Sequence, residues 1–242
     1  MSKLSNYAGA GKETITDVKT AYLKIAQKQS EEINKNKPSY IEGLQEGQFF
    51  NSVTRKIYGE KVDLIVFATR KSYALIDDDN QFKGAEPAIR PDWVRDAQGV
   101  LRTREGYKAQ LNYGYMVAVY DEVVAAVKDG RPIDTMVFTL KATSINAAKE
   151  WNTSLQQLKL EDGTSCPIFG GVWELTSVYQ ENKKGSWYAV ESAGGLCKGF
   201  IGDEIVDAVA ETSKLCIDNA KAAGVIANNA QTPMIGADAD IA

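Results

Sequence analysis

Three segments of the chain place cationic side chains close to aromatic ones. They are residues 70–73, residues 81–111 with Tyr113 and Tyr115 of the strand that follows, and residues 183–188. In proteins that bind single-stranded nucleic acid, cations neutralise the phosphates while flat rings stack on the bases. The segments therefore predict a nucleic-acid interface. Its candidate residues are Arg70, Lys71, Tyr73, Arg102, Arg104, Tyr113, Tyr115, Lys183, Lys184 and Trp187.

Each segment also has a purely structural interpretation. Cations in residues 81–111 can pair with neighbouring carboxylates, and Tyr113 and Tyr115 fall on one face of an extended chain, where they can pack in a core. Trp187 follows a turn and can take part in ordinary hairpin packing. The carboxylates concerned are Glu86, Asp92, Asp96 and Glu105. Both interpretations stay open on the sequence alone.

The elements that must position these residues are organised around residues 47–73. Alternate residues of the run 62–69 are apolar on both sides of an extended chain, as expected of a strand in the middle of a core. One side holds Val62, Leu64, Val66 and Ala68, and the other holds Ile65, Phe67 and Thr69. The turn residues Tyr58-Gly59-Glu60 precede this strand, and Phe49-Phe50 predicts its partner strand.

Two helices are predicted later in the chain. Ser144 can cap the first, whose buried stripe is Ala148, Trp151, Leu155 and Leu158. The second begins near Gly202 and places Ile205, Val209, Thr212 and Cys216 on one stripe. With five to seven short strands between Gly-rich turns, the pattern predicts a β-rich α+β fold, a partly open OB-like barrel with one inserted helix and a C-terminal helix.

The chain divides accordingly into four parts. We expect a flexible N-terminal arm at 1–19, the β-rich core at 20–201, the C-terminal helix at 202–223 and a disordered acidic tail at 224–242. Residues 199–242 carry two lysines against seven carboxylates, whereas the rest of the chain has 26 cations against 25 carboxylates. A nearly neutral body with an acidic end is compatible with DNA binding.

Two blocks of sequence resemble a known group of proteins. The first is Gly47-Gln48-Phe49-Phe50-Asn51-Ser52-Val53-Thr54, with Ile57-Tyr58-Gly59 and Arg70-Lys71-Ser72-Tyr73 after it. The second is Phe138-Thr139-Leu140-Lys141-Ala142-Thr143-Ser144, followed by Ala147-Ala148-Lys149-Glu150-Trp151-Asn152. Together they resemble a family of early proteins of tailed bacteriophages, some of which are labelled single-stranded DNA-binding or replication-associated.

The amino-acid composition excludes several kinds of catalytic site. The chain has no histidine, which excludes Ser-His-Asp and Cys-His catalysis and removes the commonest metal ligand. We therefore expect neither an enzyme nor a bound cofactor or metal. Three widely spaced cysteines suit reduced thiols. The polar start and the lack of a long apolar run predict a cytoplasmic protein without a membrane partner. The resemblance to phage proteins implies that this is the cytoplasm of an infected host cell.

These observations favour a sequence-nonspecific single-stranded DNA-binding protein that acts in phage replication or recombination. The acidic tail resembles those by which single-strand binders recruit replication or recombination proteins, and a homo-oligomer is compatible with the sequence. The alternative is a non-catalytic adaptor in phage replication or host takeover. A metal-dependent nuclease would need carboxylates that converge, for which the candidates are Asp63, Asp77 and Asp79.

Overall fold

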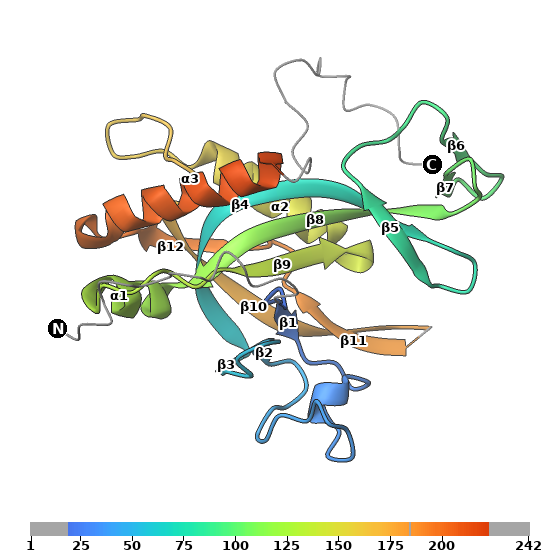
Figure 1. Ribbon diagram of the computed structural model, residues 1–242, viewed down its shortest axis with the longest axis horizontal. Helices are drawn as coiled ribbons and strands as arrows, with labels where there is room; N and C mark the ends of the chain where they lie inside the picture. Colours follow the sequence, from blue (N-terminus) through green and yellow to red (C-terminus); the bar gives the residue numbers. More distant parts are fainter. Residues whose placement is uncertain (1–18, 184, 223–242) are drawn as a thin grey trace.

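The computed structural model describes residues 19–183 and 185–222 and shows a large curled sheet with helices on both faces (Figure 1). The arm and tail predicted at the two ends lie almost wholly outside these residues. The strands are β1 (Leu23–Ile25), β2 (Phe49–Asn51), β3 (Ile57–Gly59), β4 (Lys61–Ile76), β5 (Phe82–Glu86), β6 (Val94–Arg95), β7 (Leu101–Arg102), β8 (Lys108–Val119), β9 (Met136–Lys141), β10 (Gly171–Asn182), β11 (Gly185–Val190) and β12 (Leu196–Phe200). The helices are α1 (Tyr120–Lys128), α2 (Ile145–Gln157) and α3 (Val206–Ala222), with 3₁₀ turns η3 (Glu31–Ile33), η4 (Ala142–Ser144) and η5 (Asp203–Ile205).

Strand β4 is the centre of the fold, as its two apolar faces predict. It pairs with β8 along most of its length and with β10 and β5 at its two ends, always antiparallel. Val62, Leu64 and Val66 enter the core on one face of the sheet, and Ile65 and Phe67 enter the core on the other. Because both faces are covered, all five side chains are almost fully buried.

A β-bulge changes the alternation beyond Val66. The register against β8 shifts between Val66 and Ala68, so Ala68 pairs with Met116 while Val66 pairs with Val117. An extra residue in one strand moves the following side chains to the opposite face. Ala68 therefore does not share a face with Val62, contrary to the simple alternation. Arg70 follows Ala68 on its face, and Lys71 follows Thr69 on the other.

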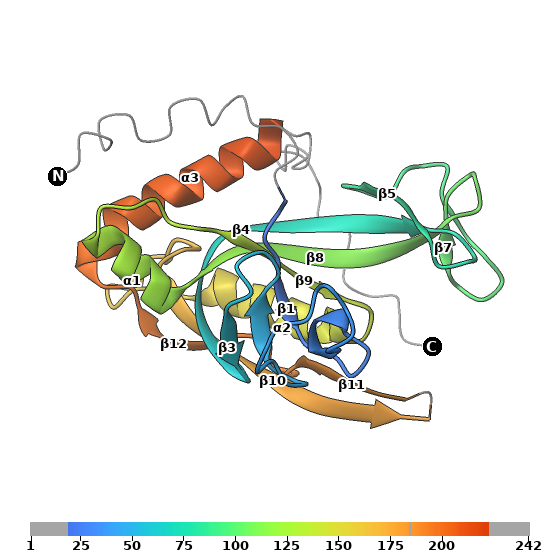
Figure 2. The same ribbon diagram turned by 60° about the horizontal axis from the view of Figure 1, so that its bottom comes forward.

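Helices cover the two faces separately. Trp151 and Leu155 of α2 pack on the face that carries Leu64, whereas Val209 of α3 packs on the face that carries Phe67. Figure 2 shows α3 on one side of the β4–β8 pair and α2 on the other. The predicted stripe of α2 is confirmed, although Ser144 occupies the N-cap position without a side-chain capping bond.

Strand Phe49–Asn51 differs from the prediction. It joins β1 and β3 in a separate three-stranded sheet instead of pairing with β4. The short connection Gly59–Lys61 turns the chain from that sheet into β4 without a hairpin between β2 and β4. The segment before β1 meets β9 through one bridge, Tyr22 with Val137.

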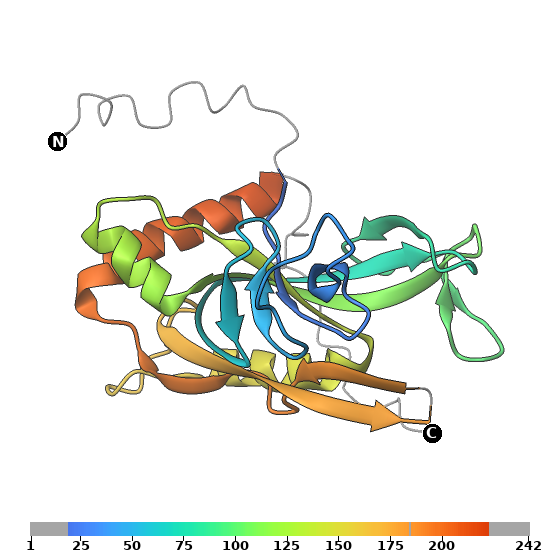
Figure 3. The ribbon, with the colours of Figure 1, turned by 90° about the horizontal axis from the view of Figure 1, so that it is seen from below.

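The large sheet is an open, curled half-barrel. Its strand order is β11-β10-β4-β8-β7-β6, with β12 beside β10, β5 beside β4 and β9 beside β8. Figure 3 shows the small sheet β1–β3 in front of the gap between β9 and the β10–β11 hairpin. The β-rich α+β half-barrel with a middle and a C-terminal helix confirms the predicted fold class, with more strands than the five of an OB-fold. Within the described residues, none of the helices has both the length and the apolar character that a membrane span requires.

Candidate nucleic-acid interface

The predicted pair Arg70 and Lys71 does not form one contact surface. Neighbouring residues of a strand point to opposite faces of the sheet. Arg70 pairs across the ladder with Gly114, and Lys71 pairs with Tyr113, which packs against the core under α2. Lys71 is exposed, and its Nζ lies 5.8 Å from the centre of the Tyr73 ring.

Two of the predicted stacking residues belong to the core. Tyr115 is 1% exposed, stacks on Trp151 at 4.4 Å between ring centres and donates its hydroxyl to Asn152 Oδ1 at 3.1 Å. Burial raises the pKa of that hydroxyl. Tyr73 is 7% exposed and meets Trp93 edge to face at 5.8 Å. A base cannot reach either ring without displacing a core partner, so we remove both from the interface.

The carboxylate-pairing interpretation holds for Arg102. Its Nε donates to Asp96 at 2.7 Å, and its Nη1 lies 3.2 Å from Asp78. Hydrogen bonds from Arg102 and Lys108 lower the pKa of Asp78. Arg104 is exposed on the adjacent turn and lies near enough to Glu105 to help lower the pKa of that carboxyl. The paired charge of Arg102 makes this segment a poor phosphate site.

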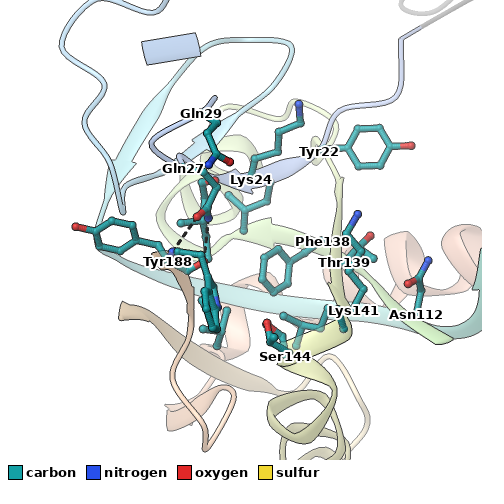
Figure 4. Close-up of a pocket in the computed structure, with 18 of the residues that line it drawn as sticks. Tyr22, Lys24, Gln27, Gln29, Asn112, Phe138, Thr139, Lys141, Ser144 and Tyr188 are labelled. Atoms are coloured by element: carbon teal, nitrogen blue, oxygen red, sulfur yellow. Dashed lines mark hydrogen bonds between the residues drawn. The ribbon is translucent and has the colours of Figure 1, made fainter. Parts of the chain in front are cut away.

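The third segment lies beside a deep groove. Trp187 is half-buried in β11 and lines the groove, while Lys183 is exposed at the end of the β10–β11 hairpin. Lys184 lies outside the described residues. We call the hollow the β9–β11 groove. It has a volume of about 650 Å³ and lies between β1 with its following residues, the end of β9 with η4, and β11 (Figure 4).

The charged side chains that line the β9–β11 groove are all cationic. The lining contains Lys24, Lys28 and Lys141 but no aspartate or glutamate. Lys24 lies 3.1 Å from Glu32, which is outside the lining. Lys28 and Lys141 are exposed, and neither forms an ion pair within the described part of the chain. Two unneutralised ammonium groups and one paired group therefore face the same hollow.

Sequence reasoning missed these three lysines. Lys24 and Lys28 sit near β1, and Lys141 ends β9, so the groove joins residues more than a hundred positions apart. No aromatic residue directly follows Lys141, so the local pattern of mixed cations and aromatic rings does not include it. Lys141 does lie in the block Phe138–Ser144 that resembles the phage family, and this block lines the groove. That resemblance is the sequence feature that could have pointed to Lys141.

Aromatic and amide groups complete the lining. Tyr22 is 43% exposed at the β9 side, and the indole Nε1 of Trp187 is buried without a hydrogen-bond acceptor among the described residues. A second hollow of about 600 Å³ shares Lys28, Thr143 and Trp187 with the first. The groove therefore continues past Trp187 towards the β10–β11 turn that bears Lys183.

A side chain from the segment after β1 bonds to β11 at the wall of the groove. Gln27 Nε2 donates to the carbonyl oxygen of Tyr188 at 2.9 Å, and the Tyr188 N–H donates to Gln27 Oε1 at 2.8 Å (Figure 4). Gly47 lies under the Tyr188 ring, where a Cβ would be 2.6 Å from Cε1. These contacts hold β11 against the segment after β1 without a strand ladder.

Cross-strand neighbours connect the groove with Arg70. Lys141 pairs with Asn112, and Asn112 pairs with Ser72. Two residues earlier on β9, Thr139 pairs with Gly114, and Gly114 pairs with Arg70. The Nε of Arg70 and the Oδ1 of Asn112 are buried and have no hydrogen-bond partner among the described residues. Arg70 thus lies on the face of the sheet that carries α3, where it lines a separate hollow of about 480 Å³ with Cys216 and Asn219, whereas Lys71 lies on the opposite face.

A family model, the Pam3 phage gp34-like protein, matches residues 1–203. The chain belongs to the Pam3 phage gp34-like protein family. The match includes every residue of the β9–β11 groove and ends before α3. No curated protein and no solved structure shows significant similarity to the chain. The resemblance to a phage protein family is thereby confirmed, and the family name states no activity.

The carboxylates considered for a nuclease do not converge in this member of the family. Asp63 pairs across the sheet with Glu174, while Asp77 lies in the turn after β4, 2.8 Å from Lys83. The part of the chain that the structure describes holds no group of three or more Cys, Asp or Glu residues placed to bind a metal ion.

Proposed function

We propose that the protein is a sequence-nonspecific, non-catalytic single-stranded DNA-binding protein of a bacteriophage, acting in replication or recombination in the infected cell. The DNA lies in the β9–β11 groove. The observation that carries the proposal is the lining of this groove, which combines three lysines with a half-buried tryptophan and contains no carboxylate.

Each group has a defined role in this proposal. The exposed ammonium groups of Lys28 and Lys141 contact phosphates, and Lys24 contributes a third cation that exchanges Glu32 for a phosphate. The ring of Trp187 stacks on a base, which contributes about 1–3 kcal/mol in other single-strand binders. Stacking on a side chain requires an exposed base face, which paired and stacked duplex bases do not offer.

Fluorescence anisotropy with labelled oligonucleotides tests this proposal. We expect the protein to bind a single strand more tightly than a duplex of equal length. Release of counterions from a single strand gives a salt slope of about −0.7 for each neutralised phosphate, so three contacts predict a slope of about −2. Raising the salt from about 50 to 200 mM should then weaken binding roughly 15-fold.

Charge reversal in the groove provides the matched comparison. Lys28→Glu and Lys141→Glu should each weaken binding and make the salt slope shallower. Lys128→Glu makes the same change at the exposed end of α1, away from the groove, and should leave affinity almost unchanged. Equal loss in all three variants, or binding that ignores salt, would contradict the groove as the DNA site.

The adaptor remains the second candidate, because exposed carboxylates gather at the start of α3. Asp203, Glu204 and Asp207 form no ion pair with any residue the structure describes. Removing residues 225–242 separates the two functions. A DNA-binding protein should keep its affinity for DNA, whereas an adaptor that recruits replication proteins through the predicted tail should lose its partner.

A further inference from the structure

Another hollow, separate from the two beside Trp187, lies at the opposite end of the sheet from the β10–β11 turn. It has a volume of about 490 Å³ and is lined by the loop between α2 and β10, the end of β12, and the residues that lead into α3. We call it the α3 pocket. It shares no lining residue with the β9–β11 groove.

Several residues that line the α3 pocket are apolar and exposed to solvent. Phe200 is 44% exposed and Leu160 is 38% exposed, and both line the hollow. Phe169 and Val206 add half-buried apolar surface that packs against the core beneath α3. Large apolar side chains gathered round a hollow are typical of sites that receive an apolar group from a partner.

The rim of the α3 pocket is acidic. Glu161, Asp162 and Asp203 line it, and the lining contains no lysine or arginine. None of the three forms an ion pair with a residue in the described ranges. The nearby Lys198 of β12 does not neutralise them, because its Nζ lies 3.1 Å from Glu174.

The pocket is held in shape before any partner arrives. Asp162 Oδ1 accepts hydrogen bonds from the Thr164 N–H at 2.9 Å and from the Thr164 hydroxyl at 2.6 Å, which fixes the acidic turn. The Ile201 N–H donates to the carbonyl oxygen of Gly170 at 3.0 Å and ties the end of β12 to the loop. A preformed site loses little entropy when a ligand binds.

We propose that the α3 pocket docks a basic segment of a partner protein, which inserts one large apolar side chain while its flanking lysines or arginines face Glu161, Asp162 and Asp203. The charge of the rim selects this partner, because the same carboxylates repel an acidic peptide and the phosphates of DNA. The site is independent of the DNA-binding groove.

Two short fluorescein-labelled peptides test the proposal with the full-length protein. In one, leucine and phenylalanine are flanked by lysine and arginine, and in the other the same apolar residues are flanked by glutamate. We expect binding of the basic peptide only. Phe200→Ser should weaken it roughly tenfold to a hundredfold, because the buried contact with the ring is lost.

Phe82→Ser is the matched control, since Phe82 is 67% exposed on β5 and outside the pocket. Glu161→Lys tests the rim at an exposed turn that carries no side-chain hydrogen bond to the core, so it stays informative if Phe200→Ser unfolds. Equal binding of both peptides, no binding of either, or equal loss in Phe82→Ser would overturn the proposal. A dimer in sedimentation that Phe200→Ser converts to a monomer would also overturn it, by assigning the face to self-association.

Discussion

The side-chain amide of Gln27 bonds to both backbone polar groups of Tyr188, although the two residues are 161 positions apart. An amide side chain that accepts from an N–H and donates to the neighbouring carbonyl imitates one pair of a strand ladder. This bond pair joins the segment after β1 to β11, and both residues line the β9–β11 groove.

Gln27→Ala should therefore destabilise the protein and weaken DNA binding together. It leaves two half-buried backbone groups without their partner, at a cost of about 1–3 kcal/mol. Urea denaturation measures the stability, and anisotropy measures the affinity. Gln98→Ala, at an exposed loop, should change neither. Normal affinity in a destabilised Gln27 variant would show that the clamp does not shape the DNA site.

Trp187 should contribute to affinity through its ring. Trp187→Ala is expected to weaken single-strand binding by about 1–3 kcal/mol, whereas Trp187→Phe, which keeps a flat ring, should retain most of it. Quenching of tryptophan fluorescence by DNA, compared between the wild type and these variants, gives a second readout. Loss of the same size in both variants would point to the indole N–H instead of stacking.

Tyr115 should affect stability without affecting DNA binding. Tyr115→Phe removes the hydroxyl that donates to Asn152 and keeps the stack on Trp151, so we expect a loss of about 0.5–1.5 kcal/mol in unfolding free energy. Affinity for the single strand should stay at the wild-type value. A selective loss of affinity at normal stability would return Tyr115 to the interface.

Gly47 should tolerate no side chain. Its φ is +82°, and an added Cβ would meet the Tyr188 ring at 2.6 Å, so Gly47→Ala combines backbone strain with a clash. Gly130→Ala is the control, because its φ is +62° but nothing lies within 4 Å of its Cβ position. We expect the Gly47 variant to lose more stability than the Gly130 variant, by about 1–3 kcal/mol as in overpacked cores. Equal melting temperatures would disprove the close approach.

Glu174 should make stability depend on pH in the acidic range. Hydrogen bonds from Lys198 and Lys61 lower the pKa of its carboxyl below the ordinary 4.5. A carboxyl with a lowered folded-state pKa binds its proton more readily when unfolded, so its contribution is present above pH 4.5 and is lost as the pH falls through the folded-state pKa. Glu174→Gln should melt below the wild type at neutral pH, and the difference should shrink on acidification. A constant difference would show that charge is not its cause.

Local pattern predicts the fold better than it predicts the site. The strand β4 and the stripe of α2 follow from periodicities within one segment, and both are present as expected. Tyr115 is buried because Trp151 of α2 stacks on it. No residue near Tyr115 in the sequence indicates this contact. Arg102 likewise forms ion pairs with Asp96 and Asp78, which lie on separate turns, so its charge is neutralised.

The bulge at residues 66–68 explains a further difference. Strict alternation of side chains along β4 does not predict that Ala68 pairs with Met116. The extra residue in the bulge determines which face of the sheet carries Arg70. Cations contributed by separate elements, such as Lys28 and Lys141, need the strand order before they can be grouped. Of the predicted interface, Trp187 lines the groove and Lys183 lies beside it, whereas Arg70 lines a separate hollow beneath α3.

The edges that bound the β9–β11 groove are joined by side chains and one isolated bridge, not by a ladder. A polymer can therefore enter such a seam sideways at any point along its contour, whereas a sealed ring of strands would have to be threaded from a free end. A covalently closed single-stranded circle meets no topological barrier here, and neither does an unpaired stretch flanked by duplex on both sides.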